Sequence, residues 1–103
     1  MTISRNSDII FTNKQRGKKF GKHCVDWGLD PSSAEDREQL ENIIHGIVLD
    51  RDEIRFGRFS GQQDDVFFYI KGNDVVVAKQ NNEFVTVMKG GITDGWVKDA
   101  RRL

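Results

Sequence analysis

The spacing of apolar residues changes at Asp50, and this change constrains the fold more than any other feature of the sequence. Before Asp50, the clearest segment repeats at the three- and four-residue spacing of a helix face. Its apolar residues are Leu40, Ile43, Ile44, Ile47 and Val48. After Asp50, β-branched and aromatic residues recur at every second position, which favours strands. No strand precedes the helices, so a parallel sheet of strand–helix–strand units is excluded. The sequence predicts an α+β fold with N-terminal helices packed on an antiparallel sheet of about four strands.

Two helices are expected in the first half of the chain. In residues 13–27, Phe20, Cys24 and Trp27 fall on one helical stripe, and the glycine that follows is placed to end the helix. In residues 33–49, serines at the start are N-cap candidates, and acidic residues occupy the first turn.

The second half of the chain predicts strands joined by short turns. The expected strands cover residues 54–56, 66–71, 74–79 and 84–89. Gly72-Asn73 and Asn81-Asn82 tolerate positive φ, so the last three strands are expected to form an antiparallel meander. The tail after residue 89 predicts a short helix or an irregular segment.

Composition limits the chain to one folded domain. Its 103 residues are 37% hydrophobic, which is enough apolar material for one core. The chain has a single proline and too little low-complexity sequence to be disordered. We expect one domain over residues 1–103, with a helical part at about 13–50 and a sheet part at about 53–90. A single cysteine, Cys24, excludes an internal disulfide and a cysteine-based zinc site, and only two histidines accompany it. We therefore expect no metal and no other cofactor.

No apolar run approaches the roughly 20 residues of a membrane-spanning helix. The N-terminus also lacks the pattern of a secretory signal. If the chain is exported, another segment is expected to carry the export signal.

Charge is balanced in total but divided along the chain. Residues 1–24 carry a surplus of five positive charges, residues 25–65 an excess of seven negative charges, and residues 66–103 a surplus of two positive charges. Such a division lets one face attract phosphate while another meets a basic partner. Two solvated helix faces of opposite sign would give the same pattern.

Lys22 and His23 form the first candidate for chemistry. Histidine is the usual proton carrier near neutral pH, and an adjacent ammonium group can contact a phosphate at the same time. The alternative is structural, because His23 lies on the apolar stripe of its helix and could be a packed residue.

Three further segments carry candidate residues. Arg58 lies in a glycine-containing loop that could hold an anion, and ordinary turn chemistry would explain the same residues. Tyr69 and Lys71 share one face of their strand, and an amphipathic strand would also explain them. Thr86 should project to the same side as Phe84 and Met88, where a buried hydroxyl would need a partner, although β-propensity alone would also place a threonine there.

His45 lies off the apolar stripe of the second helix, so we expect it to face solvent. No metal-ligand spacing links it to His23 or to acidic residues. The ten glycines form neither a dinucleotide-binding nor a P-loop pattern.

The residue order resembles a known toxin family. The segments FGKHCVDWGLDPSSAEDREQLENII, GRFSGQ and FYIKGNDVVVAKQNNEFVTVMKGGI are similar to the C-terminal toxin domains of contact-dependent growth inhibition and related polymorphic toxin systems. The likeness is to the branch near the colicin D nuclease domain and covers roughly residues 11–95. It implies the fold of the barnase, EndoU, colicin and RelE group, in which N-terminal helices pack on a curved antiparallel sheet.

The resemblance also implies an activity and its residues. Such domains are metal-independent ribonucleases that usually act on transfer RNA, and the K-H pair at the end of the first helix is catalytic. That role falls here on Lys22 and His23, and the family's hydroxyl residue corresponds to Thr86. The chain departs from the pattern at Phe20, where the relative has a lysine, and at Met88, where it has a tryptophan. These departures bear mainly on the identity of the substrate.

RNA supplies its own nucleophile, the 2′-hydroxyl, so the expected products are a 2′,3′-cyclic phosphate and a 5′-hydroxyl. We expect His23 and Lys22 to act with Thr86 and Tyr69, which could position the phosphate or relay a proton. The candidate phosphate-binding residues are Lys19, Arg58, Lys71 and Lys89.

The family context implies partners and a location. The expected partners are a transfer RNA substrate and a cognate immunity protein, with a host translation factor as a further candidate. The domain would be exported as part of a larger toxin protein and act in the cytoplasm of a competing bacterium. The alternatives are a non-enzymatic protein-binding module and, less favoured, a metal-dependent DNA-cutting toxin.

Overall fold

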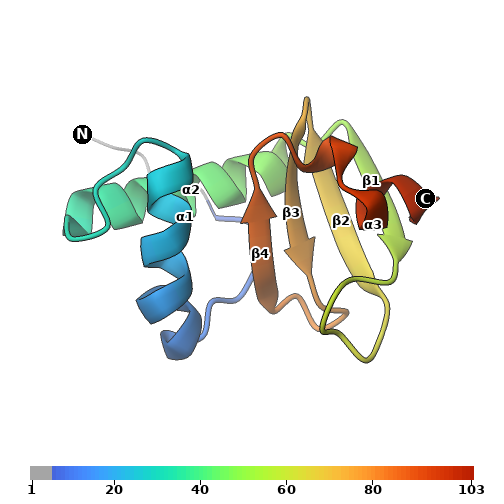
Figure 1. Ribbon diagram of the computed structural model, residues 1–103, viewed down its shortest axis with the longest axis horizontal. Coiled ribbons are helices and arrows are strands. Elements are labelled where there is room, and N and C mark those ends of the chain that lie inside the picture. The colour runs from blue at the N-terminus through green and yellow to red at the C-terminus, as the bar shows by residue number, and fades with distance from the viewer. Residues whose placement is uncertain (1–5) are drawn as a thin grey trace.

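Helices occupy the first half of the chain and a sheet the second, which confirms the expected α+β fold (Figure 1). The computed structural model describes residues 6–103, and of Lys18 and Lys19 only the backbone. The helical elements are η1 (a π-helix, Gln15–Lys19), α1 (Phe20–Asp26), α2 (Ala34–Leu49), η2 (a 3₁₀ helix, Gly91–Thr93) and α3 (Gly95–Asp99). The strands are β1 (Glu53–Gly57), β2 (Val66–Lys71), β3 (Asp74–Ala78), β4 (Phe84–Met88) and β5 (Arg101–Arg102).

Side-chain caps mark where the N-terminal helices begin, and one glycine marks where α1 ends. The Ser33 side chain accepts a hydrogen bond of 3.2 Å from the backbone N–H of Asp36 and so begins α2 where expected. Gly28, with φ of +70°, follows α1 in a left-handed conformation that is accessible to glycine. Thr12 and Gln15 cap each other before η1, because each backbone N–H donates to the other's side-chain oxygen at 3.1 and 3.3 Å.

The sheet is antiparallel, with strand order β4-β3-β2-β1-β5. The expected meander of β2, β3 and β4 is confirmed, and its turns contain Gly72 and Asn82 at φ of +60° and +72°. The sheet has five strands where about four were expected. The extra strand, β5, consists of two arginines, so it carries no alternation that could have marked it in the sequence.

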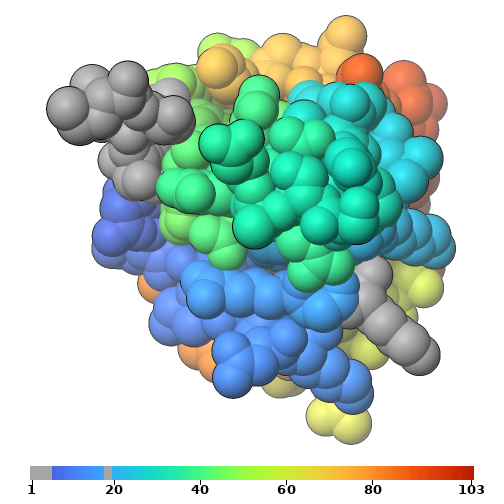
Figure 2. Space-filling model, turned by 90° about the vertical axis from the view of Figure 1, so that its left-hand side faces the viewer, coloured from blue at the N-terminus to red at the C-terminus, as the bar shows by residue number. Residues whose placement is uncertain are grey.

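Two separate apolar clusters lie on the two faces of the sheet. The first cluster joins α1 and α2 to β3 and β4, and Figure 2 shows the helical segments covering that end of the molecule. The second cluster joins β2, β3 and β4 to α3. The buried residues of the first are Ile9, Phe20, Cys24, Leu40, Ile44, Ile47, Val48, Val76, Ala78, Phe84 and Val87. Those of the second are Val66, Phe68, Ile70, Val75, Val77, Val85 and Val97.

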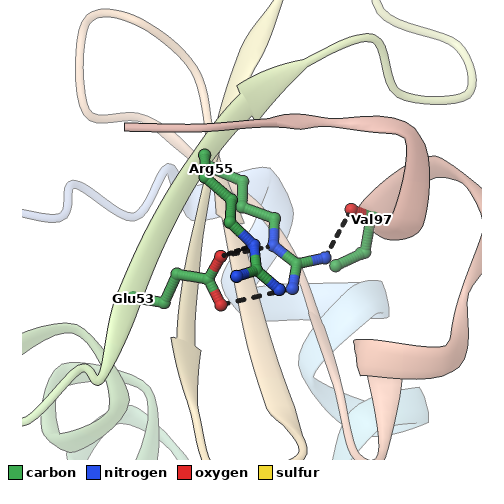
Figure 3. A network of polar contacts seen from close by, with 4 residues as sticks. Glu53, Arg55 and Val97 are labelled. Atoms are coloured by element: carbon green, nitrogen blue, oxygen red, sulfur yellow. Dashed lines mark hydrogen bonds and ion pairs between the residues drawn. The ribbon is translucent and has the colours of Figure 1, made fainter.

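A buried arginine ties the C-terminal segment to β1 (Figure 3). The side chain of Arg55 is only 8% exposed, and its guanidinium contacts both carboxylate oxygens of Glu53 at 2.8 and 3.2 Å. It also donates to the carbonyl of Val97 at 2.9 Å, while Arg102 adds an ion pair to Glu53 at 2.9 Å. We call Glu53, Arg55, Val97 and Arg102 the arginine clamp. The clamp holds α3 against the second face of the sheet and β5 beside β1.

Candidate functional site

His23 and Thr86 meet at the edge of the sheet although 63 residues separate them in the chain. His23 lies in α1 and Thr86 in the middle of β4, and both side chains are half-buried. The Thr86 Oγ1 atom and the His23 Nε2 atom are 3.1 Å apart, which is hydrogen-bonding distance. The structure thus brings together two residues that the sequence singled out separately.

A bulge in β4 determines which face of the sheet Thr86 occupies. The pairing with β3 shifts between Phe84 and Thr86, so that Val85 is an extra residue in β4. Thr86 pairs with Val77 of the second cluster and shares that face with Met88. Phe84 belongs to the first cluster, so the expectation that it shares a face with Thr86 is wrong. The extra residue breaks the strict alternation on which that expectation rested.

The position of β4 explains how Thr86 still reaches α1. β4 is the last strand on its side of the sheet, and α1 lies beside that edge in Figure 1. A cleft of about 450 Å³ opens there between α1 and β4. Its lining residues are His23, Asp26, Thr86, Val87, Met88 and Lys89. The imidazole and the hydroxyl are therefore accessible to a ligand that enters this cleft.

An aromatic ring positions one cation at the cleft. The Lys89 ammonium nitrogen lies 5.4 Å from the centre of the Trp27 ring, a cation–π distance. Trp27 follows His23 by four residues along the chain, a spacing that places both on one side of a helix. α1 thus provides the imidazole, and the turn directly after it provides the ring that holds Lys89.

Two further predicted cations lie on or just before α1. Lys22 is exposed and adjacent to His23, but it is not among the residues that line the cleft. Lys19 is the last residue of η1, and its side chain lies outside what the structure describes. Lys22 can therefore attract a phosphate toward the cleft rather than contact it from within.

Three predicted residues lie elsewhere in the fold. Tyr69 is on β2, and since β3 lies between β2 and β4, about 10 Å of sheet separates it from Thr86. Lys71, at the end of β2, pairs with Asp50 at 3.6 Å. Arg58 follows β1 and is exposed near the opposite edge of the sheet. The structure does not bring these residues to the His23 cleft.

His45 is buried rather than exposed to solvent, so that expectation is wrong. Its side chain lies in the core at 8% exposure, and its Nδ1 atom accepts a hydrogen bond of 3.0 Å from the backbone N–H of Ser7. Burial lowers the pKa of His45, with opposing contributions from Glu41, which raises it, and Arg16, which lowers it. The N-terminal segment, which the helical pattern could not place, covers this ring.

Sequence reasoning missed two residues of the site. Asp26 lines the cleft, and Trp27 holds Lys89 at its rim. They follow His23 by three and four residues, so the helical spacing of α1 could have identified both as neighbours of the imidazole.

No protein-family model, curated protein or solved structure matches the chain. Among residues 6–103, no group of three or more His, Cys, Asp or Glu side chains is arranged to hold a metal ion. Within the same residues, none of the helices has the length and apolar character needed to cross a membrane. The resemblance to colicin D-like toxin domains therefore stays a prediction.

Proposed function

We propose that the chain is a metal-independent ribonuclease and that the cleft between α1 and β4 is its active site. The observation that carries the proposal is the 3.1 Å contact between His23 Nε2 and Thr86 Oγ1 in a cleft that also contains Lys89. Cleavage at a 2′-hydroxyl needs a proton acceptor, a proton donor and a cation near the phosphate. The imidazole, reached through the hydroxyl, can accept the proton, and the ammonium group provides both the proton donor and the cation.

The geometry supports a proton relay that begins at the substrate. Thr86 Oγ1 accepts the proton of the 2′-hydroxyl while its own proton passes to His23 Nε2, so one proton moves from RNA to the imidazole. The 2′-oxygen then attacks phosphorus, and the bond to the 5′-oxygen breaks. Lys89, the ammonium group lining the cleft, balances the charge that builds on the phosphoryl oxygens and can protonate the leaving oxygen. The products are a 2′,3′-cyclic phosphate and a 5′-hydroxyl.

The biological role rests on the sequence resemblance. Transfer RNA is the substrate class that it implies, cut in the cytoplasm of a competing bacterium after export as part of a larger toxin. A cognate immunity protein would cover the cleft with acidic residues opposite Lys22 and Lys89. A complex that leaves His23 open would contradict this arrangement. Full activity on purified RNA would argue against a requirement for a host translation factor.

Cleavage of RNA by variants of the full chain tests the active site. Replacing His23 with Ala should lower the rate about 100-fold or more, the usual contribution of acid–base catalysis. Thr86→Val removes the hydroxyl at nearly constant volume and should lower kcat about tenfold or more, whereas Thr86→Ser should restore most of it. Thr93→Val, at an exposed threonine of η2, is the matched control. Wild-type rates in a folded His23→Ala protein would refute the proposal.

Two further measurements separate the alternatives. Cleavage should persist in excess chelator, and its loss there would indicate a metal-dependent nuclease instead. After induced expression without an immunity gene, total nucleic acid should show discrete small-RNA fragments. Intact RNA would favour a binding module, and degraded DNA would favour a DNA-cutting toxin.

A further inference from the structure

Three aromatic rings form a continuous row on β1 and β2. Phe56 and Phe67 pair across the two strands with ring centres 4.9 Å apart, and the Phe67 and Tyr69 centres are 6.1 Å apart. Cross-strand partners and residues two apart lie on one face of a sheet, so all three rings share that face. We call Phe56, Phe67 and Tyr69 the aromatic row.

The core does not account for the aromatic row. Phe56 and Phe67 are half-buried and belong to neither apolar cluster, and only Tyr69 packs against the first cluster. α2 contacts β2 as well as β3, but the fully buried sheet residues of the first cluster all lie in β3 and β4. The row therefore lies where the helical layer leaves the sheet partly uncovered, and neighbouring apolar rings left partly exposed on a surface point to a binding role.

Arginines lie at both ends of the aromatic row. The Arg51 guanidinium carbon is 5.8 Å from the centre of the Tyr69 ring. At the other end, Arg101 of β5 pairs with Phe56 and so shares its face. Rings flanked by guanidinium groups are complementary to bases flanked by phosphates.

A cleft of about 370 Å³ opens at the Phe56 end of the row. Its lining residues are Phe56, Gly57, Arg58, Asp65, Trp96, Asp99 and Arg101. Two carboxylates offset the two guanidinium groups there, so the cleft has little net charge. Stacking on the rings, rather than charge alone, would then carry the affinity.

We propose that the aromatic row binds unpaired bases of a single-stranded RNA segment, with Arg51 and Arg101 contacting its phosphates. The inference deepens the proposed ribonuclease function by naming the substrate class as unpaired rather than duplex RNA. Bases in a duplex are already stacked on one another, whereas unpaired bases can stack on side chains with little dependence on sequence. Because β2 and β1 lie two and three strands from β4, the row acts on binding and not on the chemical step.

The test is the binding of a short fluorescein-labelled 2′-O-methyl RNA, followed by fluorescence anisotropy. This RNA has no free 2′-hydroxyl, so binding is measured apart from cleavage. Phe67→Leu keeps an apolar side chain but removes the ring and should weaken binding of the single strand about tenfold, within the range for one stacked base. Phe59→Leu is the matched control, because Phe59 is also half-buried but packs against the second cluster. It should bind as the wild type does.

The outcomes separate this inference from the ribonuclease proposal. The inference is supported if the wild-type protein prefers the single strand over a duplex and Phe67→Leu binds the single strand more weakly. This holds whether or not the chain cleaves RNA. Unchanged binding by a folded Phe67→Leu protein overturns it, even if His23-dependent cleavage is confirmed. If thermal denaturation shows Phe67→Leu to be unfolded, Arg101→Gln at the exposed end of the row replaces it. Unchanged binding by that variant, at equal melting temperature, likewise overturns the inference.

Discussion

Removal of the carboxylate from the arginine clamp should destabilise the protein more than removal of the whole charge pair. Glu53→Gln leaves the buried Arg55 guanidinium without its counter-ion, a change that costs about 3–5 kcal/mol in fully buried pairs. Because the Glu53 side chain is 24% exposed, water screens part of the loss, and we expect about 3 kcal/mol. Arg55→Met removes the charge itself and leaves the Val97 carbonyl without its hydrogen-bond donor, so it should lower the free energy of unfolding by about 2 kcal/mol.

The double variant tests whether the losses of unfolding free energy in the two single variants are coupled or simply add. With neither charge present, Glu53→Gln with Arg55→Met should cost about 2 kcal/mol, less than Glu53→Gln alone. Urea denaturation followed by tryptophan fluorescence provides the measurement, and Trp96 lies next to Val97 at the clamp. An additive double variant, or a Glu53→Gln cost below about 1 kcal/mol, would refute the account of a desolvated cation held by one carboxylate.

Two further predictions concern the core. Burial lowers the pKa of His45, so its contribution to stability is fully present above the unfolded pKa near 6.5 and is lost as the pH falls below that value. In His45→Asn, the amide oxygen can still accept from Ser7, so the free energy of unfolding measured in urea should change less between pH 7 and pH 5 than in the wild type. An equal loss of unfolding free energy in both proteins would contradict this. Gly91→Ala would place a Cβ 2.5 Å from that of Met88 and should cost about 1–3 kcal/mol in the same assay. Gly95→Ala should cost almost nothing, because the added carbon would meet nothing within 4 Å beyond its own helix backbone and chain neighbours. Equal costs for the two variants would argue against overpacking.

The sequence predicted most of the fold because local signals mark its elements. The Ser33 cap, the glycine after α1 and the turn at Gly72 each act through a few neighbouring residues, so they can be identified without tertiary information. β5 and the arginine clamp could not be predicted in this way. Both depend on contacts between β1 and a segment more than forty residues later.

The candidate site shows the same limit. His23 and Thr86 were identified by residue type, but their contact depends on β4 being the last strand beside α1, and the face of Thr86 depends on the bulge at Val85. An alternating pattern reveals neither. Tyr69 has a chemically suitable side chain, yet the order of the strands places it away from α1. His45 was expected in solvent because helical spacing does not show that an irregular N-terminal segment lies over it.

The arginine clamp has a consequence for the order in which the domain forms during translation. The α2 helix and the strands up to β4 leave the ribosome before residues 91–102, which supply the cover of the second face. Until those residues emerge, Arg55 has no Val97 carbonyl to bind, and valine and phenylalanine side chains of the nascent sheet stay in contact with water. Partly made chains of this kind expose surfaces on which aggregation begins and chaperones act.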